Sequence, residues 1–326
     1  MELYRITLSP LTAFGTPIVG DTLFGQLCWT LRHLHGVARL AQLLHGYTSD
    51  EPFMILSDAF PQGFVPLPTL PSSLWRKTEN ADRKALKKKR WLAVGNLGSL
   101  SAEWQSLAFN DAEVAETYKA SALSSERAQP HNSINRMTGA TGKDGFAPYA
   151  QNQLWYHPDV RLDVYVLLDE SRLILDDFIQ ALGVIAKTGY GRDASVGLGK
   201  FTFEIDAHTW PQPTQISHVM TLAPCAPQNL GFASQRSFYQ VQTRFGRHGD
   251  AAALGANPFK HPLLMAKTAA VFGYAADQQP NEVPEYIGQG IGGVSSMQPT
   301  AVHQGYAPVL GVYLEHASTL TTESSI

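Results

Sequence analysis

The spacing of hydrophobic and polar positions predicts both strands and helices in the first two thirds of the chain. Residues 3–8 alternate in the way that is typical of a strand with one apolar face. After a loop rich in Gly and Pro, apolar residues recur at helical spacing from Leu23 to Leu34, which predicts an amphipathic helix. Either Asp21 or Thr22 could cap the beginning of this helix with a side-chain oxygen.

Further apolar runs extend this pattern along the chain. Residues 53–56 and 162–168 read as buried strands, 171–187 as an amphipathic helix and 200–205 as a final strand. The polar stretch around 66–130 reads as an insertion with short helices. Without it, the order is strand, helix, strand, strand, helix, strand, which is the ferredoxin-like order that RNA-recognition modules also use.

The sequence therefore predicts an α+β protein with two ferredoxin-like (RRM-like) domains. The first should span 1–208 and contain the insertion, and the second, a degenerate copy, should span 209–326. In this second part we expect strands over 219–222 and 307–314 and a helix over 263–272.

A glycine-rich loop between the second predicted helix and the last strand is the strongest candidate for chemistry. Glycine lets a backbone approach a partner closely, and successive N–H groups in such a loop attract anionic oxygens. Because the loop leaves a helix and enters a strand, it is neither a dinucleotide fingerprint nor a Walker A loop. A turn that merely packs the helix on the sheet is the alternative. The residues expected to hold phosphate are Gly189, Tyr190, Gly191, Arg192, Ser195, Gly197, Gly199 and Lys200.

Three other segments have residue types suited to RNA. Gly20 lies just before a helix N-terminus, a seat for phosphate that the anionic Asp21 would weaken. The loop from 131 to 136 offers amide and guanidinium groups, which suit single-stranded bases and phosphates, unless it is simply a solvated loop. The C-terminal half has few cations, which could contact either RNA or another subunit. The candidates are His131, Asn132, Asn135 and Arg136 in the first loop, and Arg244, Arg247 and Lys260 in the C-terminal half.

Aromatic residues follow the 131–136 loop, namely Phe146, Tyr149, Trp155 and Tyr156. They could line an extended hairpin on which bases stack, or they could pack in the core or in a subunit interface.

The charge balance neither requires nor excludes a nucleic acid. The chain has 25 Lys and Arg against 28 Asp and Glu, a net charge of −3, whereas free RNA-binding proteins are usually basic. A subunit that shares its RNA with neighbours need not be. Many of the cations lie in one run from Arg76 to Arg90, which reads either as a nucleic-acid patch or as a solvated helix face.

No cofactor or metal is expected. Cys28 and Cys225 are too few for a zinc site or a disulfide framework, and no acidic or Cys/His cluster has ligand spacing. The chain shows neither a signal peptide nor a run of eighteen apolar residues, so we expect a cytoplasmic protein without a membrane partner.

Taken in order, these motifs resemble the RAMP superfamily of CRISPR effector proteins, and within it the group that forms the fourth subunit of type III-A Csm complexes. The resemblance covers nearly the whole chain. Besides the glycine-rich loop, the segments that carry it are Phe14–Leu27, His131–Gly142, Thr243–Gly249, Asn257–Met265 and His303–Leu310.

The resemblance implies a non-catalytic subunit that anchors the repeat-derived 5′ handle of guide RNA. It also implies two protein partners, the large polymerase-like subunit and the backbone RAMP subunit, and a hairpin that wedges between nucleotides. The alternative is a metal-independent endoribonuclease, since His33 and His35 lie at the end of the first predicted helix and histidine suits proton transfer near neutral pH. The same histidines could instead favour the helix dipole.

Overall fold

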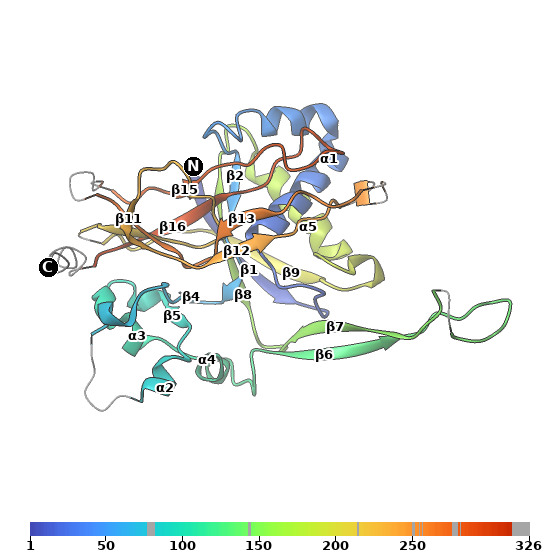
Figure 1. Ribbon diagram of the computed structural model, residues 1–326, viewed down its shortest axis with the longest axis horizontal. Coiled ribbons are helices and arrows are strands. Elements are labelled where there is room, and N and C mark those ends of the chain that lie inside the picture. Colours follow the sequence, from blue (N-terminus) through green and yellow to red (C-terminus); the bar gives the residue numbers. More distant parts are fainter. Residues whose placement is uncertain are drawn as a thin grey trace, which may run out of the picture.

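The computed structural model combines two β-sheets, two principal helices and a long projecting hairpin (Figure 1). Within the described residues, no helix has both the length and the apolar character needed to cross a membrane. The described residues are 1–76, 82–142, 145–213, 215–249, 252–253, 255, 257–275, 280 and 282–314.

The first sheet contains the strands predicted from the N-terminal part. Its order is β2–β8–β1–β9, and every neighbouring pair is antiparallel. Strand β8 is buried along its whole length because helices cover one face and the second sheet packs near the other. The strands are β1 (Glu2–Pro10), β2 (Met54–Leu56), β8 (Leu162–Leu168) and β9 (Phe201–Ala207), with β3 (Phe60–Pro61) also pairing with β8.

Two helices, α1 (Gly20–Leu44) and α5 (Leu175–Thr188), pack on this sheet and on each other. Their apolar stripes supply much of the main core. Helix α1 is interrupted at Gly36, whose φ of +87° only glycine adopts easily, and it continues across this kink to Leu44, beyond the stretch predicted from Leu23 to Leu34.

The start of each helix differs from the sequence prediction. Neither Asp21 nor Thr22 caps α1: the helix begins after Val19, whose side chain offers no hydrogen bond. Helix α5 begins at Leu175 rather than at Ser171, because Ser171 lies in a turn held by hydrogen bonds to Asp169.

The insertion contains short elements, as predicted. One of its helices, α4, has a capping box in which Asn110 and Glu113 bind each other's backbone N–H groups. The elements are β4 (Phe64–Pro66), η1 (Ser72–Leu74), α2 (Arg83–Leu86), β5 (Trp91–Ala93), η2 (Val94–Asn96), η3 (Ser101–Glu103), α3 (Trp104–Leu107) and α4 (Asp111–Thr117).

A hairpin of β6 (Ser124–His131) and β7 (Tyr149–Tyr156) projects well beyond the body of the molecule (Figure 1). Its register runs from Ser124 opposite Tyr156 to His131 opposite Tyr149. At its base, Leu154 and Phe14 exchange backbone hydrogen bonds of 2.8 Å, which tie the hairpin to the loop before α1. The extended hairpin that the aromatic residues suggested is therefore present.

The second sheet has the order β11–β14–β10–β16–β15. It confirms the strands predicted near 219–222 and 307–314. Its strands are β10 (His218–Thr221), β11 (Ala233–Phe238), β14 (Val271–Gly273), β15 (Tyr286–Gly288) and β16 (Tyr306–Val312), and a separate hairpin pairs β12 (Val241–Arg244) with β13 (Leu263–Ala266).

The helix predicted over 263–272 is wrong. The segment forms β13, a turn in which Ala269 has a φ of +66°, and then β14. In a short apolar run, periodicity does not distinguish a strand from a buried helix. Here the segment forms strands because its backbone pairs with neighbouring strands. Between 215 and 314 the described residues contain no α-helix, so the predicted second ferredoxin-like copy has strands but not its helices there.

The two sheets are joined by polar contacts as well as by packing. The buried side chain of Gln304 donates to the carbonyl of Leu56 and accepts from its N–H, at 2.8 and 3.0 Å, as a neighbouring strand would. The N–H of Asp58 donates to the carbonyl of Leu222 at 2.9 Å. The end of β2 is thereby fixed between the two halves of the chain.

Candidate nucleic-acid interface

The glycine-rich loop is held together by close backbone approaches that only glycine permits. A Cβ on Gly189 would lie 2.2 Å from the carbonyl oxygen of Leu198, and a Cβ on Gly199 would lie 2.2 Å from that of Tyr190. Both glycines also have positive φ. At these two positions, therefore, glycine serves the packing of the loop, as the alternative reading proposed.

Most N–H groups of the loop already have acceptors inside the protein. The N–H of Tyr190 bonds to Gly199, that of Gly199 to Ala13 and that of Lys200 to the Thr12 hydroxyl, at 2.7–3.0 Å. The side chain of Gln26 binds the loop twice: it donates to the carbonyl of Gly189 at 2.7 Å and accepts from the N–H of Gly191 at 3.1 Å. Nothing in the sequence pattern singled out Gln26, since a lone amide on a helix has no signature.

Tyr190 contributes to the loop from the inside. Its ring is fully buried, and its hydroxyl accepts from the N–H of Val19 and donates to the carbonyl of Pro17. Burial raises the pKa of this phenol above its usual value. Tyr190 thus secures the start of α1 and has no surface to offer to RNA.

The tip of the loop is the part that faces solvent. The N–H groups of residues 192–195 have no acceptor among the described residues, and Arg192 and Ser195 are exposed. Arg192 donates to the carbonyl of Asn152 on β7 at 3.0 Å, which joins the loop tip to the base of the hairpin. Its Nε also lies 3.2 Å from the carboxylate of Asp193, an anion that reduces the attraction for phosphate. Gly197, with open space around it, lies beside this tip.

The N-terminus of α1 already binds a carboxylate of the protein. The N–H of Gly20 donates to Asp58 at 2.9 Å, and a Cβ on Gly20 would lie 2.4 Å from the carbonyl oxygen of Leu56. Thr268 donates a second hydrogen bond to Asp58. Desolvation raises the pKa of Asp58 to about 7, although these two hydrogen bonds oppose the shift. Glycine at position 20 therefore allows the close approach of the Leu56 backbone.

Arg244 forms an internal ion pair with Asp21. Its guanidinium donates to both carboxylate oxygens, at 2.6 and 2.5 Å, and His303 Nε2 lies 3.2 Å from the same group. Desolvation alone would raise the pKa of Asp21, but His303 and Arg244 hold it well below its usual range. This pairing explains why Asp21 does not cap α1, and it fixes β12 to that helix.

The other two C-terminal cations differ from Arg244. Arg247 is exposed, and its guanidinium carbon lies 6.0 Å from the centre of the Phe259 ring. The stem of Lys260 covers Gly246, and desolvation lowers the pKa of its ammonium group. Phe245 and Phe259 are 78% and 61% exposed, which is unusual for phenylalanine.

One face of the β6–β7 hairpin presents rings and cations. His131 stacks on Tyr149 with 5.3 Å between ring centres and 15° between planes, and the guanidinium of Arg127 lies 5.7 Å from the Trp155 ring. Tyr156 points the opposite way and packs edge-on against buried Phe14 at 5.6 Å. Hence Tyr149 and Trp155 belong to the exposed face, whereas Tyr156 belongs to the core.

The hairpin tip carries the remaining predicted residues. The Asn135 side chain accepts from the N–H of Met137 at 2.9 Å, a local turn that shapes the tip. Asn132 and Arg136 are exposed, and Arg136 has no ionic or hydrogen-bonding partner among the described residues. Met137 is 96% exposed, so the tip lies in solvent.

Three of the seven described cations in the basic run form ion pairs within the insertion. Arg76 pairs with Glu103, Lys89 with Glu113 at 2.7 Å, and Arg90 with Asp111 at 3.0 Å; the run's Lys77 lies outside the described residues. The other four, Arg83, Lys84, Lys87 and Lys88, are exposed and form no ion pair among the described residues, so the pairs do not decide between a solvated surface and a nucleic-acid patch.

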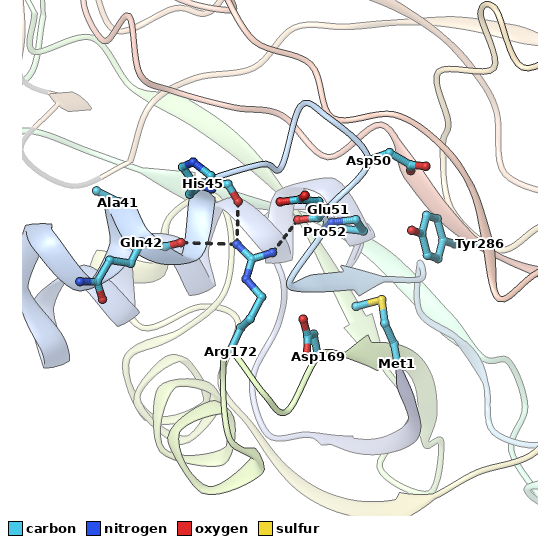
Figure 2. Close-up of a pocket in the computed structure, with 10 residues that line it drawn as sticks. All are labelled: Met1, Ala41, Gln42, His45, Asp50, Glu51, Pro52, Asp169, Arg172 and Tyr286. Atoms are coloured by element: carbon cyan, nitrogen blue, oxygen red, sulfur yellow. Dashed lines mark hydrogen bonds between the residues drawn. The ribbon is translucent and has the colours of Figure 1, made fainter.

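A surface cavity of about 720 Å³ lies elsewhere, beside the end of α1 (Figure 2). Arg172 points into it but donates to the backbone carbonyls of Glu51, Leu43 and His45 at 2.6–2.7 Å. Asp50, Glu51 and Asp169 also line it. Because its one guanidinium is engaged and its other charged side chains include three carboxylates, the cavity is unsuited to RNA.

The two histidines of the alternative nuclease hypothesis, His33 and His35, contact different residues. His33 stacks against Trp29, with 6.4 Å between ring centres, and His35 Nε2 lies 4.0 Å from Asp177 of α5. Within the described residues, no group of three or more His, Cys, Asp or Glu is placed to hold a metal ion. Cys28 and Cys225 are free and buried, as expected of small apolar residues.

Known proteins resemble this chain in structure rather than in sequence. No protein-family model and no curated protein matched the sequence. Two similar structures are a Csm1–Csm4 cassette with pppApA (13% identity, TM-score 0.59, 97% of this chain and 100% of that chain) and a Csm3–Csm4 subcomplex of the type III-A CRISPR-Cas interference complex (14%, 0.60, 95% and 99%). A Csm1–Csm4 cassette with cA4 is similar too (13%, 0.59, 96% and 99%). Csm4 is the component that all three share, and this chain has the fold of Csm4, a type III-A RAMP subunit, over nearly its whole length.

Proposed function

We propose that this chain is a non-catalytic subunit of a type III-A CRISPR effector complex and anchors the 5′ handle of the guide RNA. The observation that carries the proposal is the hydrogen bond from Arg192 to the carbonyl of Asn152. It brings the exposed tip of the glycine-rich loop to the base of the hairpin, so that two separately predicted segments form one surface. Phosphate contacts at the loop tip would fix the register of the RNA, and rings on the hairpin would stack on its bases.

The N-terminal part supports this proposal through its topology. The elements β1, α1, β2, β8, α5 and β9 follow the ferredoxin-like order, and the sheet order β9–β1–β8–β2 places the first and third strands in the centre. We assign this part to a ferredoxin-like RAMP domain over 1–208. In such a domain the glycine-rich loop joins α5 to the edge strand β9, beside the hairpin.

Two protein partners belong to the proposal. Csm4 occurs together with Csm1 in two of the similar structures and with Csm3 in the third. By analogy, this chain would bridge a large polymerase-like subunit to the first backbone subunit.

The test is to isolate the complex from its native cells through a tag on this chain and to sequence the RNA that accompanies it. We expect short RNAs with one shared repeat-derived 5′ end. The double variant Arg136→Ala/Arg192→Ala should remain folded but should lose most of this RNA. A matched control is Arg76→Ala/Arg90→Ala, which removes two exposed cations that are already paired with carboxylates.

Two outcomes would contradict the proposal. Full retention of RNA by Arg136→Ala/Arg192→Ala would exclude those residues as anchors, and the absence of CRISPR RNA from the wild-type preparation would exclude the function. Longer repeat RNA that accumulates only in a His33→Ala/His35→Ala variant would favour the nuclease alternative.

A further inference from the structure

The two faces of the β6–β7 hairpin carry different side chains. Successive residues of a strand point to opposite faces, so the register assigns each residue of the hairpin to one side. Every second residue from Ser125 to His131 and from Tyr149 to Trp155 lies on one face, which we call the amide face because it carries three glutamines. The opposite face carries Glu126, the one acidic residue of the two strands, and beside it mostly small or apolar side chains.

Two of these glutamines form one cross-strand pair. Gln129 lies directly opposite Gln151. The next pair toward the tip on this face is His131 opposite Tyr149, whose rings stack. Same-face neighbours along a strand are about 7 Å apart, so a base held by the two amides would lie beside the Tyr149 ring. The third glutamine, Gln153, is buried and takes no part in this pair.

The amides of this pair are largely free. Gln129 is exposed, and its one side-chain hydrogen bond among the described residues is a long one, 3.4 Å to the carbonyl of Pro130. The side chain of half-buried Gln151 has no hydrogen-bonding partner among the described residues. By contrast, Gln26 and Gln304 each use both ends of the amide to hold protein backbone. The pair on the hairpin therefore keeps its donors and acceptors available to a ligand.

The tip of the glycine-rich loop lies at the same level of the hairpin. Arg192 donates to the carbonyl of Asn152, the residue that follows Gln151. A phosphate held at the loop tip would therefore bring a neighbouring base to the amide face. Phosphate contacts position a nucleic acid, whereas contacts to base edges carry the sequence information.

We infer that Gln129 and Gln151 read an unpaired adenine of the bound RNA. An amide has a donor and an acceptor side by side, and this combination matches the 6-amino group and N7 of adenine. Proteins recognise single-stranded RNA by stacking a base on an aromatic ring and bonding to the edge of that base. Tyr149, half exposed beside the two amides, supplies the ring. The inference rests on the proposed function and adds base recognition to it.

The test uses the full chain and two fluorescent single-stranded RNAs of roughly a dozen nucleotides, oligo-adenosine and oligo-purine riboside. The two probes share the ring system, N7 and the phosphates, but purine riboside lacks the 6-amino group. The wild type should bind oligo-adenosine about 5- to 150-fold more tightly, since a bidentate contact to a base discriminates by this factor.

The variant Gln129→Met/Gln151→Met removes both amides at similar side-chain volume. It should bind the two probes alike, because nothing on the face then distinguishes the 6-amino group. The slope of log K against log salt concentration should stay as in the wild type, because no phosphate contact is lost.

Asn152→Leu is the matched control. It removes an exposed amide from the same strand, but one that points to the opposite face. The backbone carbonyl that accepts from Arg192 remains, so the contact between loop and hairpin is kept. This variant should prefer oligo-adenosine by the same factor as the wild type, and its thermal midpoint, like that of the glutamine variant, should match the wild type.

The outcomes separate this inference from the proposed function. If Gln129→Met/Gln151→Met keeps the preference for oligo-adenosine, the amides do not read the base and the inference is wrong. If the wild type binds the two probes equally, or binds neither, the inference is also wrong. In each of these cases the proposed function stands as long as guide RNA accompanies the complex and is lost in Arg136→Ala/Arg192→Ala. If no guide RNA accompanies the wild type, the proposed function is wrong, and the inference that rests on it is wrong too.

Discussion

The glycine-rich loop and the tip of the β6–β7 hairpin contain similar polar residues but use them differently. In the loop, the N–H groups of Tyr190, Gly191 and Gly199 are bonded within the protein, and two glycines allow backbones to touch. At the hairpin tip, Arg136 and Met137 lie in solvent. The difference indicates that substitutions in the loop should act first on folding, whereas substitutions on the hairpin should act on binding alone.

The largest effect is expected where β12 meets helix α1. Asp21→Ala would leave the Arg244 guanidinium and His303 without their carboxylate, in a partly desolvated site. Breaking such a buried pair by removing one partner costs about 3–5 kcal/mol. Chemical denaturation should therefore show a free energy of unfolding lower by about this amount.

The control is Asp111→Ala, which breaks the exposed pair with Arg90. An exposed pair contributes at most about 1 kcal/mol. Equal losses in the two variants would contradict the distinction between the buried and exposed pairs.

Substitution of Gly199 should have the next largest effect. In Gly199→Ala the new methyl group would lie 2.2 Å from the Tyr190 carbonyl oxygen, at a residue with φ of +74°. Overpacking costs about 1–3 kcal/mol, and the left-handed conformation adds roughly 1–2 kcal/mol. We expect a thermal midpoint clearly below that of the wild type.

Gly197→Ala is the matched variant within the same loop. Gly197 also has positive φ, at +98°, but its Cβ would meet no atom within 4 Å. Only the conformational cost of roughly 1–2 kcal/mol should remain. If the two variants melted together, close approach would not be the reason for glycine at 199.

The pH dependence of stability should be smaller still and should depend on Asp58. Its pKa is raised to about 7 in the folded protein, against about 3.9 in an unfolded chain, so the folded state binds the proton more tightly. Ionised Asp58 therefore lowers stability progressively as the pH rises from about 4 to about 7, and the penalty is complete above that.

Asp58→Asn removes this penalty while its amide oxygen can still accept from the N–H of Gly20. The variant should be more stable than the wild type by about 1–3 kcal/mol near pH 8 and should gain nothing near pH 4. Denaturation at several pH values measures the difference. An unchanged gap between variant and wild type across this range would show that Asp58 does not titrate there.

The parts of the structure that the sequence predicted are those with strong local signals. The helical stripe of α1 gave the right element because its period matches a helix only, and the apolar runs at 53–56 and 162–168 gave the right elements because runs of this length favour strands. The partners of Asp21, Gly20 and Gln26 could not be predicted, since each lies on a segment distant in sequence. The helix over 263–272 failed for the same reason: strand pairing across the second sheet determined its structure.

The smallest effect on stability, and the clearest on binding, is expected on the hairpin. Tyr149 is half exposed and, among the described residues, its ring stacks on His131 alone, so Tyr149→Ala should change the free energy of unfolding by less than about 0.5 kcal/mol. If bases stack there, the same variant should weaken RNA binding by about 1–3 kcal/mol. Tyr156→Ala is the control from the opposite face of the same strand, where the ring packs on Phe14. It should lower stability first, because removing a buried aromatic ring costs about 3–5 kcal/mol. Both variants should be measured together with the wild type. If the Tyr149 variant melts well below the wild type, or the Tyr156 variant is as stable as the wild type, the assignment of the two hairpin faces is reversed.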